Sequence, residues 1–291
     1  AQPYSFSEGR GAWRVGPPAS RVASDGVSPA RRREHHVVAI DYGLKGLHLN
    51  FASGMVSSSQ AILAGFDFIR QGRATVFLAG GFDSLNVHLF QGLDARGLLA
   101  PGEAAAGAGA PFGAARGGFV AGEGGGMVVL EDWDHAAARG ARVCGEILGA
   151  GMAGDSRLAA GASPAPNGIT RAMQAALADA ALPWAAMDAV LASANGSAHG
   201  DLNEAVAITG LPGGRGAGMP VSAVKALTGE TLGGGGALQV IAAVGMMENG
   251  FLAPASADVP VMADPPVNLV RGAAMDKVLE RVMVNSVDIG G

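Results

Sequence analysis

Residues 50–69, with the sequence NFASGMVSSSQAILAGFDFI, decide the fold. The apolar run 47–52 predicts an extended strand, and the small residues Ser53 and Gly54 ahead of Met55 predict a tight turn. A helix is expected to follow, because apolar side chains then recur at helical spacing on one face. These side chains are Ile62, Phe66 and Ile69.

The order of strand, sharp turn and helix is typical of a nucleophile elbow, in which one side chain stands above the sheet edge at a helix N-terminus. The side chain at this turn is Met55. A thioether has no proton to lose, so Met55 is not an acyl nucleophile. The alternative is a displaced nucleophile, Ser53 or Ser57, with His199 as its base.

The composition predicts a protein that buries surface against another subunit. Apolar residues make up 49% of the 291 residues and charged residues only 15%, whereas charged residues are about 25% of typical soluble domains. The formal net charge of -5 indicates neither nucleic acid nor an anionic membrane surface as a partner. The 47 glycines lie between apolar runs, which indicates close backbone packing and tight turns.

Neither a disulfide nor a membrane span is expected. Cys144 is the single cysteine, and we expect it to be a buried residue in a strand over 143–149. No apolar run approaches the roughly 18 residues of a membrane span and no secretory signal is visible, so a cytoplasmic location is predicted. Residues 1–40 show no clear period and are expected to form an irregular arm. His35 and His36 within it lack a third ligand at metal-binding spacing.

Residues 41–62, DYGLKGLHLNFASGMVSSSQAI, resemble the nucleophile region of the β-ketoacyl synthases, which carry a cysteine where Met55 stands. Further on, the apolar run 76–78 predicts a strand that is buried on both faces. It leads into Ala-Gly-Gly and an acidic residue, Asp83, which matches the same family.

The most specific match is PFGAARGGFVAGEGGGMVVLE at residues 111–131, which is similar to the family pattern PFDxxRDGFVxGEGAGxxVLE. The matched positions include Arg116, Phe119 and Glu123. Without the resemblance, the glycines of this segment indicate a packing turn. They do not fit a phosphate-binding loop, because both the Lys-Ser/Thr ending and the GxGxxG order are missing.

The second half of the chain continues the resemblance. A helix is predicted over 168–181 from the spacing of Ile169, Met173 and Leu177, and a strand over 188–193. Directly after that strand the family has a histidine, and the resemblance places Asn195 at its position. His199 lies four residues further on and is a different position.

Residues 220–241, PVSAVKALTGETLGGGGALQVI, are similar to a second family motif that contains a lysine and a histidine. The resemblance places Lys225 on the lysine and Glu230 on the histidine. A helix is expected to begin at 233–236, with an apolar face made of Leu238, Ile241 and Gly245. The final run VMVNSVDIGG resembles the family's closing motif, with Val287 and Ile289 at two aromatic positions.

The resemblance covers residues 41–291 and implies an α/β fold of the thiolase type, layered αβαβα, with two related halves. The predicted divisions are an irregular arm at 1–40, an N-terminal half at 41–154 and a C-terminal half at 155–291. The first strand and helix of the family's N-terminal half have no counterpart in residues 1–40. We therefore expect this half to be truncated, which favours a dependent subunit.

The chemistry of the family is condensation, which needs a thiolate to carry the acyl chain and two imidazoles to stabilise the enolate that forms as CO2 leaves. Met55, Asn195 and Glu230 stand at those three positions, so we expect no such activity from this chain alone. The resemblance implies a chain-length factor, the degenerate heterodimer partner of an active β-ketoacyl synthase in polyketide, aryl-polyene or related fatty-acid biosynthesis. It implies contact with acyl carrier protein through that complex, and no cofactor, metal, nucleic acid or membrane.

Apolar side chains near the helix after Met55 and the strand at 76–78 would then set the length of the product. The tunnel candidates are Phe66, Phe82 and Leu85, each of which is more simply interpreted as part of the core. Lys225 is interpreted as an inherited member of a structural salt bridge.

Overall fold

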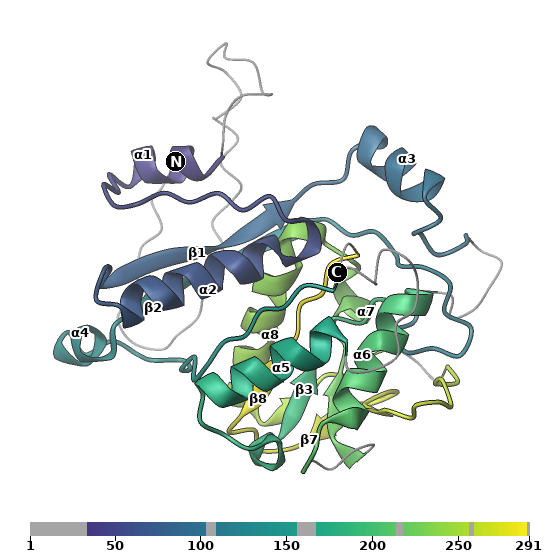
Figure 1. Ribbon diagram of the computed structural model, residues 1–291. Helices are drawn as coiled ribbons and strands as arrows, with labels where there is room; N and C mark the ends of the chain where they lie inside the picture. Colours follow the sequence, from purple (N-terminus) through teal and green to yellow (C-terminus); the bar gives the residue numbers. More distant parts are fainter. Residues whose placement is uncertain (1–33, 103–108, 156–166, 214–217, 256–258, 290–291) are drawn as a thin grey trace. The chain divides into compact units, whose positions relative to one another are not determined.

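The computed structural model describes residues 34–102, 109–155, 167–213, 218–255 and 259–289 (Figure 1). The chain divides into two units, Ala1–Asn50 and Phe51–Gly291, and each is described by itself. The predicted boundary between the halves, at 154/155, directly precedes residues 156–166, which lie outside the described residues, and the predicted halves remain a prediction.

The first unit contains helix α1 (Glu34–Asp41), followed by open chain to Asn50. The irregular arm expected up to residue 40 is therefore helical from residue 34. The strand expected over 47–52 is not formed: Leu47 and Leu49 are exposed, and no described residue pairs with this run as a strand. A strand needs a neighbour to satisfy its backbone groups, and the described residues supply none.

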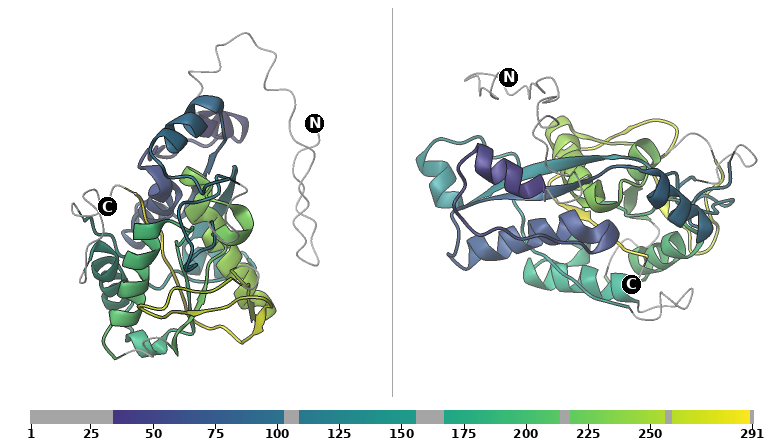
Figure 2. Two further views of the ribbon diagram at one scale, coloured as in Figure 1. Left: turned by 90° about the vertical axis from the view of Figure 1, so that its right-hand side faces the viewer. Right: turned by 90° about the horizontal axis from the view of Figure 1, so that it is seen from above.

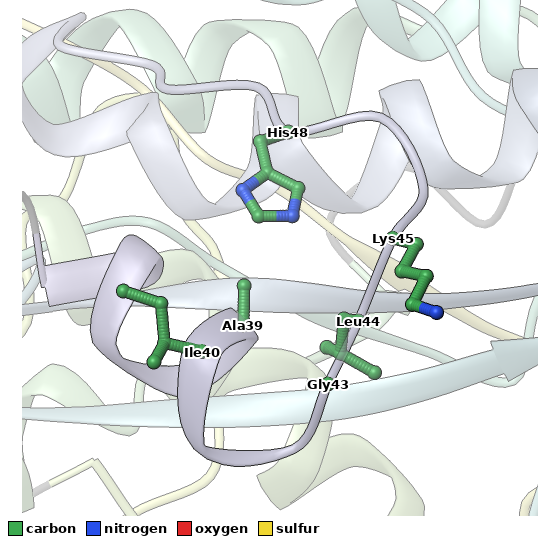
Figure 3. A pocket seen from close by; sticks show the side chains of 6 residues that line it. All are labelled: Ala39, Ile40, Gly43, Leu44, Lys45 and His48. Carbon is green, nitrogen blue, oxygen red and sulfur yellow. The ribbon is translucent and has the colours of Figure 1, made fainter.

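A shallow hollow lies between α1 and the open chain of the first unit (Figure 3). Its lining residues are Ala39, Ile40, Gly43, Leu44, Lys45 and His48. All of them except Ala39 are exposed. Four of these residues lie within the motif at 41–62, but none of the candidate site residues Met55, Asn195 and Glu230 lines the hollow.

The first layer of the second unit is a two-stranded antiparallel sheet. Strand β1 (Val76–Asp83) pairs with β2 (Gly124–Glu131), from Val76 opposite Glu131 to Asp83 opposite Gly124. Helices α2 (Ser57–Arg70) and α8 (Gly235–Asn249) cover one face of it. Ile62, Ala79 and Ala237 form the core between these elements.

The second sheet has four parallel strands in the order β6 (Asn268–Leu269), β4 (Pro220–Ser222), β3 (Ala189–Leu191) and β8 (Val282–Val284). Helices α5 (Gly168–Asp179) and α6 (Ala198–Gly210) pack on one face, where Val190 contributes to their core. Helix α8 packs on the other face against Leu191.

Helix α8 therefore contacts both sheets, and the layers run sheet, helices, sheet, helices (Figures 1 and 2). This arrangement is α/β as predicted and contains four of the five layers of the expected αβαβα order. At one end of the second unit, an ion pair between Arg70 and Asp179, with the Nη1 and Oδ1 atoms 2.6 Å apart, joins α2 to α5.

The remaining elements are short. They comprise helices α3 (Val87–Ala95), α4 (Trp133–Ala138) and α7 (Lys225–Thr228), the 3-10 turns η2 (Gly54–Val56), η4 (Trp184–Ala186) and η6 (Leu232–Gly234), and the antiparallel pair β5 (Phe251–Leu252) and β7 (Met275–Asp276).

The first strand differs from its predicted burial. Strand β1 forms as expected, but its outer face and that of β2 are exposed because the helices of this unit lie on one side only. The exposed apolar side chains are Val76, Leu78, Phe82, Met127 and Val129. A continuous apolar run thus predicted the strand correctly and its burial on both faces wrongly.

The predicted strand over 143–149 is absent, and Cys144 is exposed instead of buried. The neighbours of this segment are helices. Gly145 faces Val244 of α8, and Gly149 approaches the backbone of Ala176 and Ala180 in α5 so closely that a side chain at residue 149 would overlap them. No described strand pairs with the segment.

The spacing of apolar residues predicted the buried face of α5 correctly and that of α8 wrongly. In α5, Ile169, Met173 and Leu177 are all buried as predicted. In α8 the predicted apolar face is wrong, since Ile241 is 40% exposed. The buried face instead carries mainly small residues and two longer side chains. It consists of Gly235, Gly236, Ala237, Gln239, Ala243 and Met246.

The contact between α8 and α2 provides a direct test. A Cβ atom at Gly236 would overlap Ser59 Oγ, whereas one at Gly245, in the same helix, would meet nothing within 4 Å. We expect Gly236→Ala to lower the free energy of unfolding by about 1–3 kcal/mol through overpacking. Gly245→Ala should leave it unchanged or raise it by up to about 1 kcal/mol. Urea unfolding of both variants measures the difference, and equal effects would contradict this packing.

Candidate functional site

The tight turn before α2 forms as the sequence predicts. Gly54 has a φ of +63°, a left-handed conformation that glycine adopts readily. The Ser57 hydroxyl closes the turn, because its Oγ accepts a hydrogen bond from Ser53 N at 2.9 Å and donates one to Gly54 O at 2.7 Å. Met55 is buried against Leu93, Phe119 and Leu232.

A carboxylate from the end of the chain meets this turn. Met55 N–H donates to Asp288 Oδ1 at 2.9 Å. The carboxylate lies so close to Gly54 that a side chain there would overlap it. Sequence analysis compared the residues on either side, Val287 and Ile289, and missed Asp288. The only signal was an acidic residue between two apolar ones.

The three polar positions of the second half come together in the core. Lys225 Nζ lies 2.8 Å from Glu230 Oε2 and donates to Ser193 Oγ at 3.0 Å. Asn195 Nδ2 donates to the same Glu230 oxygen at 2.9 Å. The side chains of Lys225 and Glu230 are only 2% and 0% exposed, so this is a buried ion pair, as predicted for Lys225.

The remaining capacity of these groups is largely used by the backbone. Glu230 Oε1 accepts from Leu232 N at 3.0 Å, and Asn195 Oδ1 accepts from Ser197 N at 3.1 Å. Lys225, Glu230 and Asn195 are therefore bonded to one another and to the loops that carry them. We call these three residues the buried triad.

Two acidic residues of α6, which the sequence analysis missed, fix the loop after β3. Asp201 accepts hydrogen bonds from the backbone N–H groups of Phe112, Asn195 and Gly196, at 2.7–3.3 Å. Glu204 Oε1 accepts from Ser193 N at 2.9 Å and from Asn285 Nδ2 at 2.8 Å. The signal for both was a pair of carboxylates three residues apart, ahead of the apolar run Ala205–Ile208 of the same helix.

The two carboxyl groups differ from ordinary ones because they are buried. Burial raises the pKa of Asp201 from 3.8 to about 7, and outweighs the backbone N–H groups that favour its ionised form. Burial also raises the pKa of Glu204, against the opposing effects of Ser193 N–H, Asn285 and Lys225.

The glycine-rich segment 111–131 has a structural role. Arg116 donates from Nε and Nη2 to Ala198 O at 3.3 and 3.2 Å, which holds the start of α6. Gly122 lies against Thr228 O without room for a side chain. Glu123 Oε2 accepts from Leu85 N at 3.1 Å. These contacts agree with the interpretation of this segment as a packing turn.

The alternative catalytic set is not brought together. The Ser57 hydroxyl is engaged within its own turn, and His199 is exposed on α6. Among the described residues, no hydrogen bond joins His199 to Ser53 or Ser57. A serine nucleophile with His199 as its base therefore has no support in this geometry.

The three tunnel candidates occupy different environments. Phe66 is half-buried beneath the guanidinium of Arg70, 4.9 Å from its ring centre. Leu85 is half-buried. Phe82 is 53% exposed on the outer face of β1, so its interpretation as core is wrong. Their role in a tunnel remains a prediction.

Two family models match the chain. The model described as β-ketoacyl synthase, N-terminal domain, matches residues 36–136, and the one described as β-ketoacyl synthase, C-terminal domain, matches residues 144–257. Nodulation protein E from Rhizobium sp. (strain N33) is 37% identical over 218 residues, which are 75% of this chain and 52% of that protein. The 3-oxoacyl-(acyl-carrier-protein) synthase 2 of Staphylococcus aureus is 31% identical over 255 residues, 87% of this chain and 62% of that protein.

The solved structure of the ishigamide ketosynthase/chain length factor is similar in fold, with a TM-score of 0.80 and 29% identity over 88% of this chain and 62% of that one. The predicted thiolase-like α/β fold is confirmed by these matches. The chain spans 52–62% of the length of the proteins compared. Among the described residues, no helix is both long enough and apolar enough to cross a membrane.

The buried ion pair predicts a strong stability effect. Lys225→Met leaves the Glu230 carboxylate buried without a cation, so the free energy of unfolding should fall by about 3–5 kcal/mol. Adding Glu230→Gln removes the uncompensated charge at nearly constant volume, so the double variant should be more stable than Lys225→Met alone. Urea unfolding compares four proteins: the unaltered chain, Lys225→Met, Glu230→Gln and the double variant. A double variant that loses the sum of the two single losses would contradict the pairing.

The raised pKa of Asp201 predicts a pH dependence of stability. The folded chain keeps this proton up to about pH 7, whereas an ordinary aspartate loses it near 3.8. The free energy of unfolding should therefore fall as pH rises from about 4 to about 7, by at most about 4 kcal/mol from this group, and level off above. Asp201→Asn should flatten this slope in part, since Glu204 still titrates. An unchanged slope in denaturant unfolding would contradict it.

Proposed function

The chain belongs to the β-ketoacyl synthase family, and we propose that it acts there as a non-catalytic, chain-length-factor-like partner of an active β-ketoacyl-(acyl-carrier-protein) synthase. In this role it completes a heterodimer and helps to wall the tunnel that receives the growing acyl chain. The products would be fatty-acid-like or polyketide chains, including the aryl-polyene type.

The observation that carries the proposal is the buried triad beside a turn that presents Met55. Condensation needs hydrogen-bond donors aimed at the oxygen that becomes negative, and removal of one such donor typically costs about 2.7–4 kcal/mol of transition-state stabilisation. Glu230 offers acceptors only, and its charge would repel an enolate. Asn195 gives its amide to Glu230 instead of to a substrate.

The loss is therefore more than a missing nucleophile. The positions of both expected imidazoles are joined to each other and to Lys225 in one hydrogen-bonded cluster. A cluster of this kind stabilises the loops after β3 and before α8 and leaves the surrounding scaffold intact. A scaffold preserved around inactive positions supports a role as a partner.

The comparisons support the proposal in part. The similar solved structure is a ketosynthase/chain length factor, which fits a partner subunit. The relative from Staphylococcus aureus is named as a synthase, so membership of the family is compatible with either role. The residues at positions 55, 195 and 230 favour the partner. The acyl carrier protein in that relative's name is the carrier we propose for the complex.

The test is co-expression with a β-ketoacyl-(acyl-carrier-protein) synthase of the same genome, followed by size-exclusion chromatography with mass determination and an extension assay. We expect a one-to-one complex that extends acyl chains only when both subunits are present, because the thiolate and imidazoles come from the partner. Replacing the partner's nucleophilic cysteine by alanine should abolish extension.

The matched controls are Ser53→Ala and His199→Ala in this chain, both of which should leave extension by the complex unchanged. A homodimer that ignores the synthase and is acylated by itself would overturn the proposal. Loss of acylation in those two variants would then identify the displaced-nucleophile alternative.

A further inference from the structure

The turn at Met55 carries a second feature that bears on acyl chemistry. The first N–H groups of a helix lack partners within the helix, and in acyl transfer such groups hold the carbonyl oxygen as it becomes negative. An acyl group attached to the side chain at position 55 would place its carbonyl oxygen next to the backbone N–H groups of this turn. The N–H of Met55 is one of these groups.

The carboxylate of Asp288 accepts the hydrogen bond of this N–H group. Its Oδ1 accepts the Met55 N–H at 2.9 Å, and the absence of a side chain at Gly54 permits the close approach. The carboxylate comes from the segment after β8, far from the turn in sequence. Its position at the turn is therefore a consequence of the tertiary structure and not of local sequence.

The segment that carries Asp288 is anchored on both the sheet and the buried triad. Asn285 N donates to Leu191 O at 2.9 Å. Val287 N donates to Ser193 Oγ at 3.0 Å, and Ser193 Oγ also accepts from Lys225. The residue that precedes Asp288 is thus tied to the same serine that binds the lysine of the triad.

We propose that Asp288 closes the acyl-binding position of this chain: its carboxylate stands where a bound acyl oxygen would be held and repels the negative charge that acyl transfer creates. Asp288 is a positioning residue, since it acts on the turn and on no substrate of its own. The inference rests on the proposed non-catalytic role. It adds that a thiol at position 55 would not by itself restore acylation.

The experiment introduces a thiol with Met55→Cys in a Cys144→Ser background, so that the chain carries a single cysteine. The probe is octanoyl-N-acetylcysteamine. In the reaction the introduced sulfur bonds to the thioester carbonyl carbon, the bond from that carbon to N-acetylcysteamine breaks, and the proton of the thiol ends on the released N-acetylcysteamine. Intact-protein mass measures the acylation rate.

We expect slow acylation in this background and a rate at least about 100-fold higher after Asp288→Ala is added, because one oxyanion donor is typically worth about 100-fold or more. Alkylation by iodoacetamide is the matched control, because it consumes the same thiol without forming an oxyanion. Its rate should change far less than that of acylation. A purely structural effect on access would raise both rates by the same factor.

Equal acylation rates with and without Asp288→Ala, including no acylation in either, would overturn the proposal, as would an equal rise in alkylation. If Asp288→Ala does not fold, Asp288→Asn carries the test. It removes the charge at constant size and should raise acylation at least about tenfold, and no rise would overturn the proposal. Acylation of the unaltered chain is a separate readout, because it would contradict the proposed function without bearing on Asp288.

Discussion

The buried ion pair between Lys225 and Glu230 is the interaction on which the rest of the site depends. Removing two charges from water carries a large desolvation cost, so such a pair persists only where further hydrogen bonds satisfy it. Here Ser193, Asn195 and the backbone of Leu232 supply those bonds. The pair thereby fixes the positions of the end of β3, helix α7 and the turn that leads into α8.

The same pair supports the proposal that the chain keeps the architecture of its family without the family's chemistry. In an enzyme of this class, two imidazoles face the substrate, and their polar atoms must remain available to it. In this chain an amide and a carboxylate stand at the positions that the family motifs give to these imidazoles, and they bond to each other. Under the proposed role, these two residues support the fold and bind no substrate oxygen.

The structure also depends on small residues where elements pack closely. Helix α8 lies against both sheets and against α2, and Gly236 permits its contact with Ser59. Gly54 has the same function at the turn, where the backbone meets the carboxylate of Asp288. The close backbone packing that the glycine content predicted is therefore found at specific glycines. Only some of the glycines are needed for close packing, since Gly245 has open space around it.

Sequence reasoning predicted best where the determining interactions are local. The turn at residues 53–55 and the spacing in α5 each follow from a few neighbouring residues. Burial depends on neighbours distant in sequence, so the outer face of β1 and the strand expected at 143–149 were wrong.

The candidate site shows the same division. Motifs singled out positions 55, 195 and 230, but the hydrogen bond between Asn195 and Glu230 could not be predicted from spacing. Asp288 was missed because it meets Met55 across 233 positions of sequence. Asp201 and Glu204 were missed because only the fold shows that carboxylates of α6 point into the core.

The central claim is that this chain supports acyl chemistry without carrying it. The most direct measurement is to incubate the complex of this chain and an active β-ketoacyl-(acyl-carrier-protein) synthase with a radiolabelled acyl thioester, and to locate the label by peptide mass. We expect label on the synthase cysteine alone. Label on any residue of this chain, at a stoichiometry comparable to that of the synthase, would contradict it.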